Sequence, residues 1–335
     1  MSNLSSRSVN DQPVSSGTYQ ARWLNRSAHF QTVIPTLFRR VQAIDWQRER
    51  IATSDEDFID VDWLTGAGSR LVILCHGLEG SSDTHYMKGM ARACASAGWD
   101  VLAYNFRGCS GEPNRLARSY HGGSTDDLAL VIKHALETSP YRKLALIGFS
   151  LGGNQVLKYL GERRLDRPAE LCAGVAISPP CDLSACSDQL ERLENKVYQI
   201  RFLRSLLTKV MSKRALIEAE LGSISTKACR NIREFDDRFV APLNGFASAE
   251  DYYQHASALP LLQSITHPTL LLSALDDPFL ASTCQPVQAQ INNPLLQLNY
   301  PRHGGHVSFR QRHPQQWYWG EQQAVEFLDA IDPVR

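Results

Sequence analysis

Residues 148–153, GFSLGG, combine residue types that suit nucleophilic chemistry. They have the form G-x-S-x-G and stand between a short apolar run and a helical pattern. A serine on a tight strand-to-helix turn is held out for attack, and the flanking glycines relieve crowding at that turn. The pattern predicts Ser150 as the nucleophile. An ordinary glycine-rich turn is the structural alternative.

An acid to support such a serine is expected in residues 273–280, SALDDPFL, directly after the apolar run PTLLL. The end of a strand places its next side chains at the carboxyl edge of a sheet. The spacing of small, acidic and aliphatic residues favours Asp277 over Asp276. The carboxylate would orient an imidazole and stabilise its cation without taking up a proton. The structural alternative is a solvated turn in which Asp276 caps a helix.

A base is expected in residues 301–309, PRHGGHVSF, beyond the last apolar run. The two glycines before His306 allow the loop to fold back over the sheet edge, where the imidazole can reach both Ser150 and Asp277. His303 is the second choice. A metal site at His303 and His306 lacks a third ligand nearby, and the sequence indicates no cofactor.

Two backbone N–H groups are needed to hold an oxyanion. One is expected from Leu151, the residue after the serine, and the other from Leu78 in the turn HGLEG at residues 76–80. His76 is interpreted as a structural histidine that orients this turn.

Short apolar runs alternate with helical patterns, which predicts a mostly parallel central sheet flanked by helices. The runs lie at residues 58–63, 71–77, 100–106, 143–149, 171–178, 267–275 and 295–300, and the helical patterns at residues 87–97, 125–137, 151–163, 284–291 and 316–331. This alternation of strand and helix patterns is interrupted at residues 179–260, where the pattern is mostly helical and charged. The expected organisation is a flexible segment at 1–20, a core at 21–178 and 261–335, and a helical cap insertion at 179–260.

Composition excludes several classes of function. The chain has 35 basic and 35 acidic residues, so no overall field attracts nucleic acid. No secretory signal or apolar run long enough to span a bilayer is found, and the eight cysteines show no metal-binding or CxxC spacing. A cytoplasmic protein with free thiols and no stable membrane anchor is expected. Its oligomeric state is not indicated.

Seven segments carry a resemblance to a known family: HGLEG, YNFRGCSGE, GFSLGGN, REFDD, DYY, ALDDPFL and HGGHVSF. Over residues 20–330 the chain resembles the YheT-like branch of the α/β-hydrolase superfamily, called AB-hydrolase type 4. The resemblance implies the α/β-hydrolase fold, Ser150, Asp277 and His306 as charge-relay residues, and carboxylic-ester hydrolysis. Animal relatives act on acylglycerols and phospholipids and usually carry an apolar N-terminal anchor, which this chain lacks before residue 50.

The expected function is hydrolysis of small-molecule carboxylic esters, with short to medium acyl chains covered by the cap, through an acyl-enzyme on Ser150. A thioesterase, an amidase or an acyltransferase with the same residues, or a non-catalytic binding protein, are the alternatives. His121 and Asp126 match an H-x4-D acyltransferase pattern, although a helix cap explains Ser124 and Thr125 there.

Two features of the insertion allow a structural and a functional interpretation. In REFDD, residues 233–237, the arginine is expected to pin the cap to the sheet. Residues 196–214 mix basic side chains with apolar ones at helical spacing: Val197, Ile200, Leu203, Leu207, Val210 and Met211. Packing of that apolar face within the cap is the main expectation, and transient contact with an anionic lipid surface is the alternative.

Overall fold

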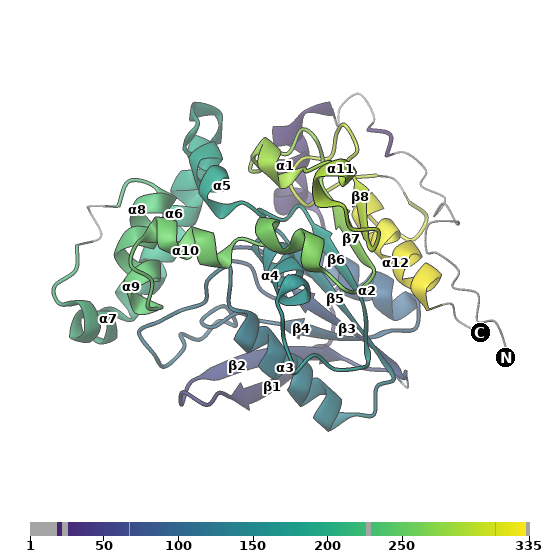
Figure 1. Ribbon diagram of the computed structural model, residues 1–335, viewed down its shortest axis with the longest axis horizontal. Coiled ribbons are helices and arrows are strands. Elements are labelled where there is room, and N and C mark those ends of the chain that lie inside the picture. Colours follow the sequence, from purple (N-terminus) through teal and green to yellow (C-terminus); the bar gives the residue numbers. More distant parts are fainter. Residues whose placement is uncertain (1–18, 22–25, 67, 226–228, 312, 333–335) are drawn as a thin grey trace.

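A computed structural model describes residues 19–21, 26–66, 68–225, 229–311 and 313–332. An eight-stranded sheet lies at its centre, in the order β1-β2-β4-β3-β5-β6-β7-β8 (Figure 1). The strands are β1 (Gln47–Ala52), β2 (Phe58–Leu64), β3 (Arg70–Cys75), β4 (Asp100–Tyr104), β5 (Lys143–Phe149), β6 (Leu171–Ile177), β7 (Thr269–Leu272) and β8 (Leu296–Asn299). The pairs β1–β2 and β2–β4 are antiparallel and the other pairs are parallel, which confirms the expected fold class.

Helices cover both faces of the sheet. Leu71 and Ile73 of β3 pack with α3 (Thr125–Thr138) and α4 (Leu151–Gly161). Val72 of the same strand packs on the other face with α2 (His85–Ser96) and α12 (Trp319–Ile331). Because both faces are buried, the central strands are continuous apolar runs rather than alternating ones.

Strand β1 was not expected from the sequence, because half of its residues QRERIA are charged and only the last two are apolar. It lies at the edge of the sheet, where Arg48 and Arg50 stand directly opposite Asp62 and Asp60 of β2. The guanidinium groups contact these carboxylates at 2.8 and 2.7 Å. Cross-strand ion pairs thus hold the first part of this strand, and Ile51 packs into the apolar core near its end.

The helix α1 (Ala28–Phe38) was also not expected. Before it, the ring of Tyr19 packs against Phe309 and Trp319, with ring centroids 6.0 and 5.4 Å apart. Most of the segment expected to be flexible, residues 1–18, lies outside the described residues. None of the helices in the described part of the chain is long and apolar enough to cross a bilayer.

Residues between β6 and β7, here called the helical insertion (179–264), gather beside the sheet (teal to green in Figure 1). The elements are α5 (Leu183–Glu191), η3 (Leu193–Asn195), α6 (Lys196–Ser212), α7 (Arg214–Leu221), α8 (Ile232–Phe235), η5 (Asp236–Val240), α9 (Ala241–Leu243), α10 (Ala249–Ala256) and η6 (Leu259–Ser264). Residues of α6, α7 and α8 form an apolar cluster of their own.

The expectation that the apolar face of α6 packs within the insertion is only partly confirmed. Leu203 and Val210 are buried, whereas Val197 and Ile200 are 76% and 63% exposed. The buried line of the helix runs through Gln199, Leu203, Leu206 and Val210, so the apolar residues of its first turns face outward.

The expected role of Arg233 needs a correction. Its guanidinium contacts Asp188 of α5 at 2.8 Å and Glu250 of α10 at 3.1 Å, and it donates to the carbonyl of Ser184 at 3.0 Å. All three partners belong to the helical insertion. Arg233 therefore joins the helices of the insertion to one another and does not pin them to the sheet.

The prediction of a single helix over residues 284–291 is also wrong. The structure has the short η7 (Ser282–Cys284) and α11 (Gln288–Ile291) instead. Pro286 lies between them, and a proline inside a helix removes a backbone hydrogen bond and clashes with the preceding turn.

The turn from β5 into α4 depends on close backbone contact. An added Cβ at Gly152 would lie 2.5 Å from the carbonyl oxygens of both Cys75 and His76, at the end of β3. An added Cβ at Gly148 would collide with the carbonyl of Gly152. Glycine at both positions lets the first turn of α4 rest directly on the carboxyl ends of β3 and β5.

We predict that Gly152→Ala lowers the free energy of unfolding by about 1–3 kcal/mol, because the new methyl group meets rigid backbone. Denaturant unfolding measures this change. Gly320→Ala is the matched control, since an added Cβ there meets Phe309 at 3.4 Å, an ordinary contact. Equal losses in the two variants would contradict this account of the turn.

Candidate active site

Ser150 occupies the turn between β5 and α4 with φ 50° and ψ −121°. This region of positive φ is unfavourable for a residue with a side chain and is found at functional sites. The serine N–H donates to the carbonyl of Ile177 at 2.8 Å, and the serine carbonyl accepts from Asn154 N–H at 3.1 Å. Both bonds fix the backbone that carries the hydroxyl.

The imidazole of His306 lies between Ser150 and Asp277. His306 Nε2 is 2.9 Å from Ser150 Oγ, and His306 Nδ1 is 2.9 Å from Asp277 Oδ2. A neutral imidazole has one donor nitrogen and one acceptor nitrogen. When Nδ1–H donates to the carboxylate, Nε2 is left to accept the serine proton. The three residues expected from the sequence are therefore within hydrogen-bonding distance of one another.

The carboxylate of Asp277 is fully enclosed, with 0% of its side chain exposed. Its Oδ1 also accepts from Phe279 N–H at 2.9 Å. The ring of Phe279 packs against the imidazole, with centroids 4.4 Å apart. These contacts hold both the acid and the histidine in one orientation.

Asp276 and His303, the second choices from the sequence, form a separate pair. His303 Nδ1 is 3.1 Å from Asp276 Oδ2, and Gly305 N–H donates to Asp276 Oδ1 at 3.0 Å. This carboxylate therefore holds the histidine loop and does not cap a helix.

Thr32 of α1 is a supporting residue that the sequence reasoning missed. Its Oγ1 accepts from His306 N–H at 3.0 Å. Gly305 has φ 59°, and an added Cβ there would lie 2.7 Å from the carbonyl of Ala28. The signal available was Ser27, whose side chain accepts from Phe30 N–H as an N-cap, but no motif links α1 to His306.

Ser178, at the end of β6, is a second missed support. Its Oγ accepts from Val307 N–H at 3.1 Å, and the two residues have φ values of 50° and 56°. A β-branched residue at positive φ is strained. Such strain persists only where the surrounding structure fixes the backbone.

The two expected oxyanion donors lie near Ser150. An added Cβ at Gly77 would be 3.0 Å from Ser150 Cβ, so the loop after β3 approaches the serine closely. Leu78 N–H makes no hydrogen bond to any residue that the structure describes, while Glu79 N–H donates to Tyr120 at 2.9 Å. Leu151 N–H belongs to the first turn of α4, whose donors have no partner within the helix.

His76 is a buried support for this loop. Its Nδ1 is 2.7 Å from the carbonyl of Gly77, and its Nε2 accepts from Phe106 N–H at 3.1 Å. Burial lowers the pKa of His76 to about 3, so the ring is neutral at pH 7 and holds the loop, as expected from the sequence.

The structure does not bring His121 and Asp126 together as an H-x4-D pair. His121 Nδ1 accepts from Gly123 N–H at 3.1 Å, and burial lowers the pKa of His121 to about 4. Asp126 is 94% exposed and pairs with Arg164 at 3.0 Å. Ser124 precedes α3 as its N-cap, but its side chain accepts from His121 N–H rather than from the helix.

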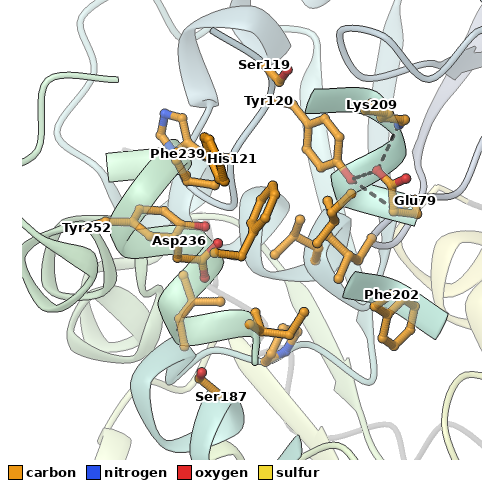
Figure 2. A pocket seen from close by; sticks show the side chains of 18 of the residues that line it. Glu79, Ser119, Tyr120, His121, Ser187, Phe202, Lys209, Asp236, Phe239 and Tyr252 are labelled. Atoms are coloured by element: carbon orange, nitrogen blue, oxygen red, sulfur yellow. Dashed lines mark hydrogen bonds and ion pairs between the residues drawn. The ribbon is translucent and has the colours of Figure 1, made fainter. Parts of the chain in front are cut away.

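Two cavities meet at Ser150 and His306. One, of about 140 Å³, lies between the core and the helical insertion and has mainly apolar walls (Figure 2). Residues of the insertion that line it include Leu183, Leu206, Ile232, Phe235, Phe239 and Leu243. The other, of about 770 Å³, is wider, and its walls include the cationic Arg39, Arg40, Lys88 and Arg201 as well as the acidic Glu79 and Asp83.

Comparison of the sequence with known proteins shows the family to which the chain belongs. The model of the alpha/beta hydrolase fold matches residues 70–312. The chain is 37% identical to YheT of Escherichia coli, over 87% of each chain. It is 29% identical to human Phospholipase ABHD3, over 89% of this chain and 75% of that protein.

A solved structure, the esterase Pf2001 of Pyrococcus furiosus, has the same fold. It superposes with a TM-score of 0.56 at 20% identity, over 86% of this chain and 91% of its own. At that identity the likeness concerns the fold alone. Together with the family match and the likeness to YheT, these findings show that the chain belongs to the α/β-hydrolase family as a YheT-like hydrolase.

Proposed function

We propose that the protein hydrolyses carboxylic esters through an acyl-enzyme formed on Ser150. The observation that carries this proposal is the continuous line of hydrogen bonds from Asp277 through His306 to Ser150 Oγ, each 2.9 Å long. The relationship to a phospholipase and to YheT supports the same class of reaction.

Each group in the line has a role in this reaction. As Ser150 Oγ attacks the acyl carbon, His306 Nε2 takes its proton, and the imidazolium is stabilised by Asp277. The oxyanion that develops is held by the N–H groups of Leu78 and Leu151. His306 then donates the proton to the departing alkoxide. A water molecule, activated by the same imidazole, attacks the acyl-enzyme and releases the acid.

The two cavities supply sites for the two halves of an ester. The narrow apolar cavity suits an acyl chain, because burial of each methylene group contributes about 0.8 kcal/mol. The wider cleft, with Arg39, Arg40 and Arg201 among its walls, suits a larger polar alcohol. We therefore propose esters of short to medium acyl chains as substrates.

Ser150→Ala is expected to abolish labelling by a fluorophosphonate probe and to lower turnover of a p-nitrophenyl ester by about a million-fold, as in a comparable triad. Gel fluorescence and initial rates measure the two effects. Ser96→Ala, at an exposed position of α2, is the control that should label fully. Labelling of Ser150→Ala at the wild-type level would remove this serine from the mechanism.

Two neighbouring carboxylates give a second test. Asp277→Asn should lower kcat by about 10⁴-fold, since the amide favours the wrong imidazole tautomer. Asp276→Asn removes only a support of the histidine loop, so its kcat should fall by less than about tenfold, roughly the effect of one lost hydrogen bond. A larger loss in Asp276→Asn than in Asp277→Asn would reverse the assignment.

The apolar cavity predicts a preference among p-nitrophenyl esters of increasing acyl length. The value of kcat/KM should rise by up to about fourfold for each added methylene group, the equivalent of 0.8 kcal/mol, until the cavity is full. Initial rates from acetate to dodecanoate measure this profile. A maximum at acetate, with a decline at every greater length, would contradict an acyl site in this cavity.

A further inference from the structure

Asp236 places a carboxyl group in the wall of the apolar cavity. The residue is only 9% exposed. Its Oδ2 accepts from the hydroxyl of Tyr253 at 2.6 Å. Its Oδ1 makes no hydrogen bond to any residue in the described ranges, so half of the carboxyl group has no protein partner.

Among the residues described, no cation forms an ion pair with this carboxyl group, although the charge of Arg233 acts on it and lowers its pKa slightly against the effect of burial. Arg233, three residues before it, turns its guanidinium toward Asp188 and Glu250, and Arg238, two residues after it, is exposed. Two lysines also line the cavity. Lys209 pairs with Glu79 at 2.8 Å, and Lys213 donates to loop acceptors that include the carbonyl of Leu116 at 2.9 Å.

Burial raises the pKa of Asp236 to about 7, although the hydrogen bond from Tyr253 and the charge of Arg233 oppose it. The fold therefore accepts a desolvation cost that an apolar residue would avoid. Asp236 also begins the π-helical segment η5. Such segments are rare and frequently occur at functional sites. Both features indicate that the carboxyl group serves a ligand rather than the stability of the fold.

Figure 2 shows Asp236 on the same side of the cavity as Tyr252, Phe239 and His121, with Glu79 and Lys209 on the opposite side. Apart from the carboxyl group, this side is largely aromatic. His121 is neutral at pH 7 because burial lowers its pKa to about 4. On this side of the cavity, a ligand that enters from Ser150 thus meets the carboxyl group of Asp236 among aromatic side chains, whereas Glu79 on the opposite side is already paired with Lys209 and Tyr120.

We propose that Asp236 is a specificity-determining residue that binds a hydroxyl group on the acyl chain of the substrate. This inference rests on the proposed ester hydrolysis and deepens it to hydroxyacyl esters as the substrate class. The hydroxyl donates to Oδ1 of the ionised carboxylate. When the carboxyl group is protonated, it donates to the hydroxyl oxygen instead, so either form makes the contact.

A hydroxyl group fits this position better than an ammonium group. An ammonium must lose its hydration in the apolar cavity and requires an ionised partner, whereas burial favours the neutral form of Asp236. A hydroxyl group costs less to desolvate and is common on otherwise apolar acyl chains.

The test compares p-nitrophenyl esters of plain alkanoic acids with esters of the same length that carry one hydroxyl group, moved along the chain from the third carbon to the end. The wild-type protein should prefer the hydroxy ester at one position by about tenfold to a hundredfold in kcat/KM, the effect of a buried hydrogen bond to a charged group. A ratio within twofold at every position overturns the proposal.

Variants assign the preference to the carboxyl group. Asp236→Leu should reduce the ratio to one or below while plain esters are still cleaved, and Asp236→Asn, which keeps the shape, should give an intermediate ratio. Tyr253→Phe removes the hydrogen bond from Tyr253 but keeps the carboxyl group, so it should retain the preference. An unchanged ratio in both Asp236 variants contradicts the assignment, as does loss of the preference in Tyr253→Phe alone.

Matched aminoalkanoate esters form a further arm, and faster cleavage of these than of the hydroxy esters overturns the hydroxyl assignment in favour of a cation. Failure of this inference is distinct from failure of the proposed reaction. Suppose that wild type cleaves plain esters, that Ser150→Ala does not, and that no hydroxy ester is preferred. In that case only the role proposed for Asp236 is wrong. If wild type cleaves no ester, the proposed ester hydrolysis itself is wrong.

Discussion

Close contact between α4 and the ends of β3 and β5 is the constraint on which the candidate site depends. Without a side chain at Gly152, the first turn of α4 rests on the carbonyl groups of Cys75 and His76. This contact forces Ser150 into a left-handed backbone conformation and keeps the loop of Gly77 and Leu78 beside it. The proposed nucleophile and oxyanion donors are thus fixed by backbone packing, before any substrate enters.

The histidine is positioned by supports from several parts of the chain. Asp276 holds Gly305, Thr32 holds the backbone of His306, and Ser178 holds Val307. Since Val307 and Ser178 both have positive φ, the loop is kept in a conformation that it would not adopt alone. The orientation of the imidazole toward Ser150 is therefore a property of the assembled fold.

Local patterns explain what the sequence could predict. The G-x-S-x-G turn and the apolar strands buried on both faces have recognisable signals, and the candidate triad was named from strand ends. Charged β1 had no such signal, because its pairing with Asp60 and Asp62 involves a second strand. Thr32 and Arg233 were missed or misplaced for the same reason, since their roles depend on contacts with distant segments.

The helical insertion encloses the apolar cavity in which Asp236 lies, and we propose that it thereby adds selectivity to this centre. We propose that Ser150 Oγ is the attacking atom and that Leu78 and Leu151 N–H receive the oxyanion. A crystal structure of the protein after reaction with a phosphonate ester tests it most directly. We expect phosphorus bonded to Ser150 Oγ, with one phosphonyl oxygen within hydrogen-bonding distance of both N–H groups. An adduct on another residue, or an oxygen that faces away from both donors, would contradict it.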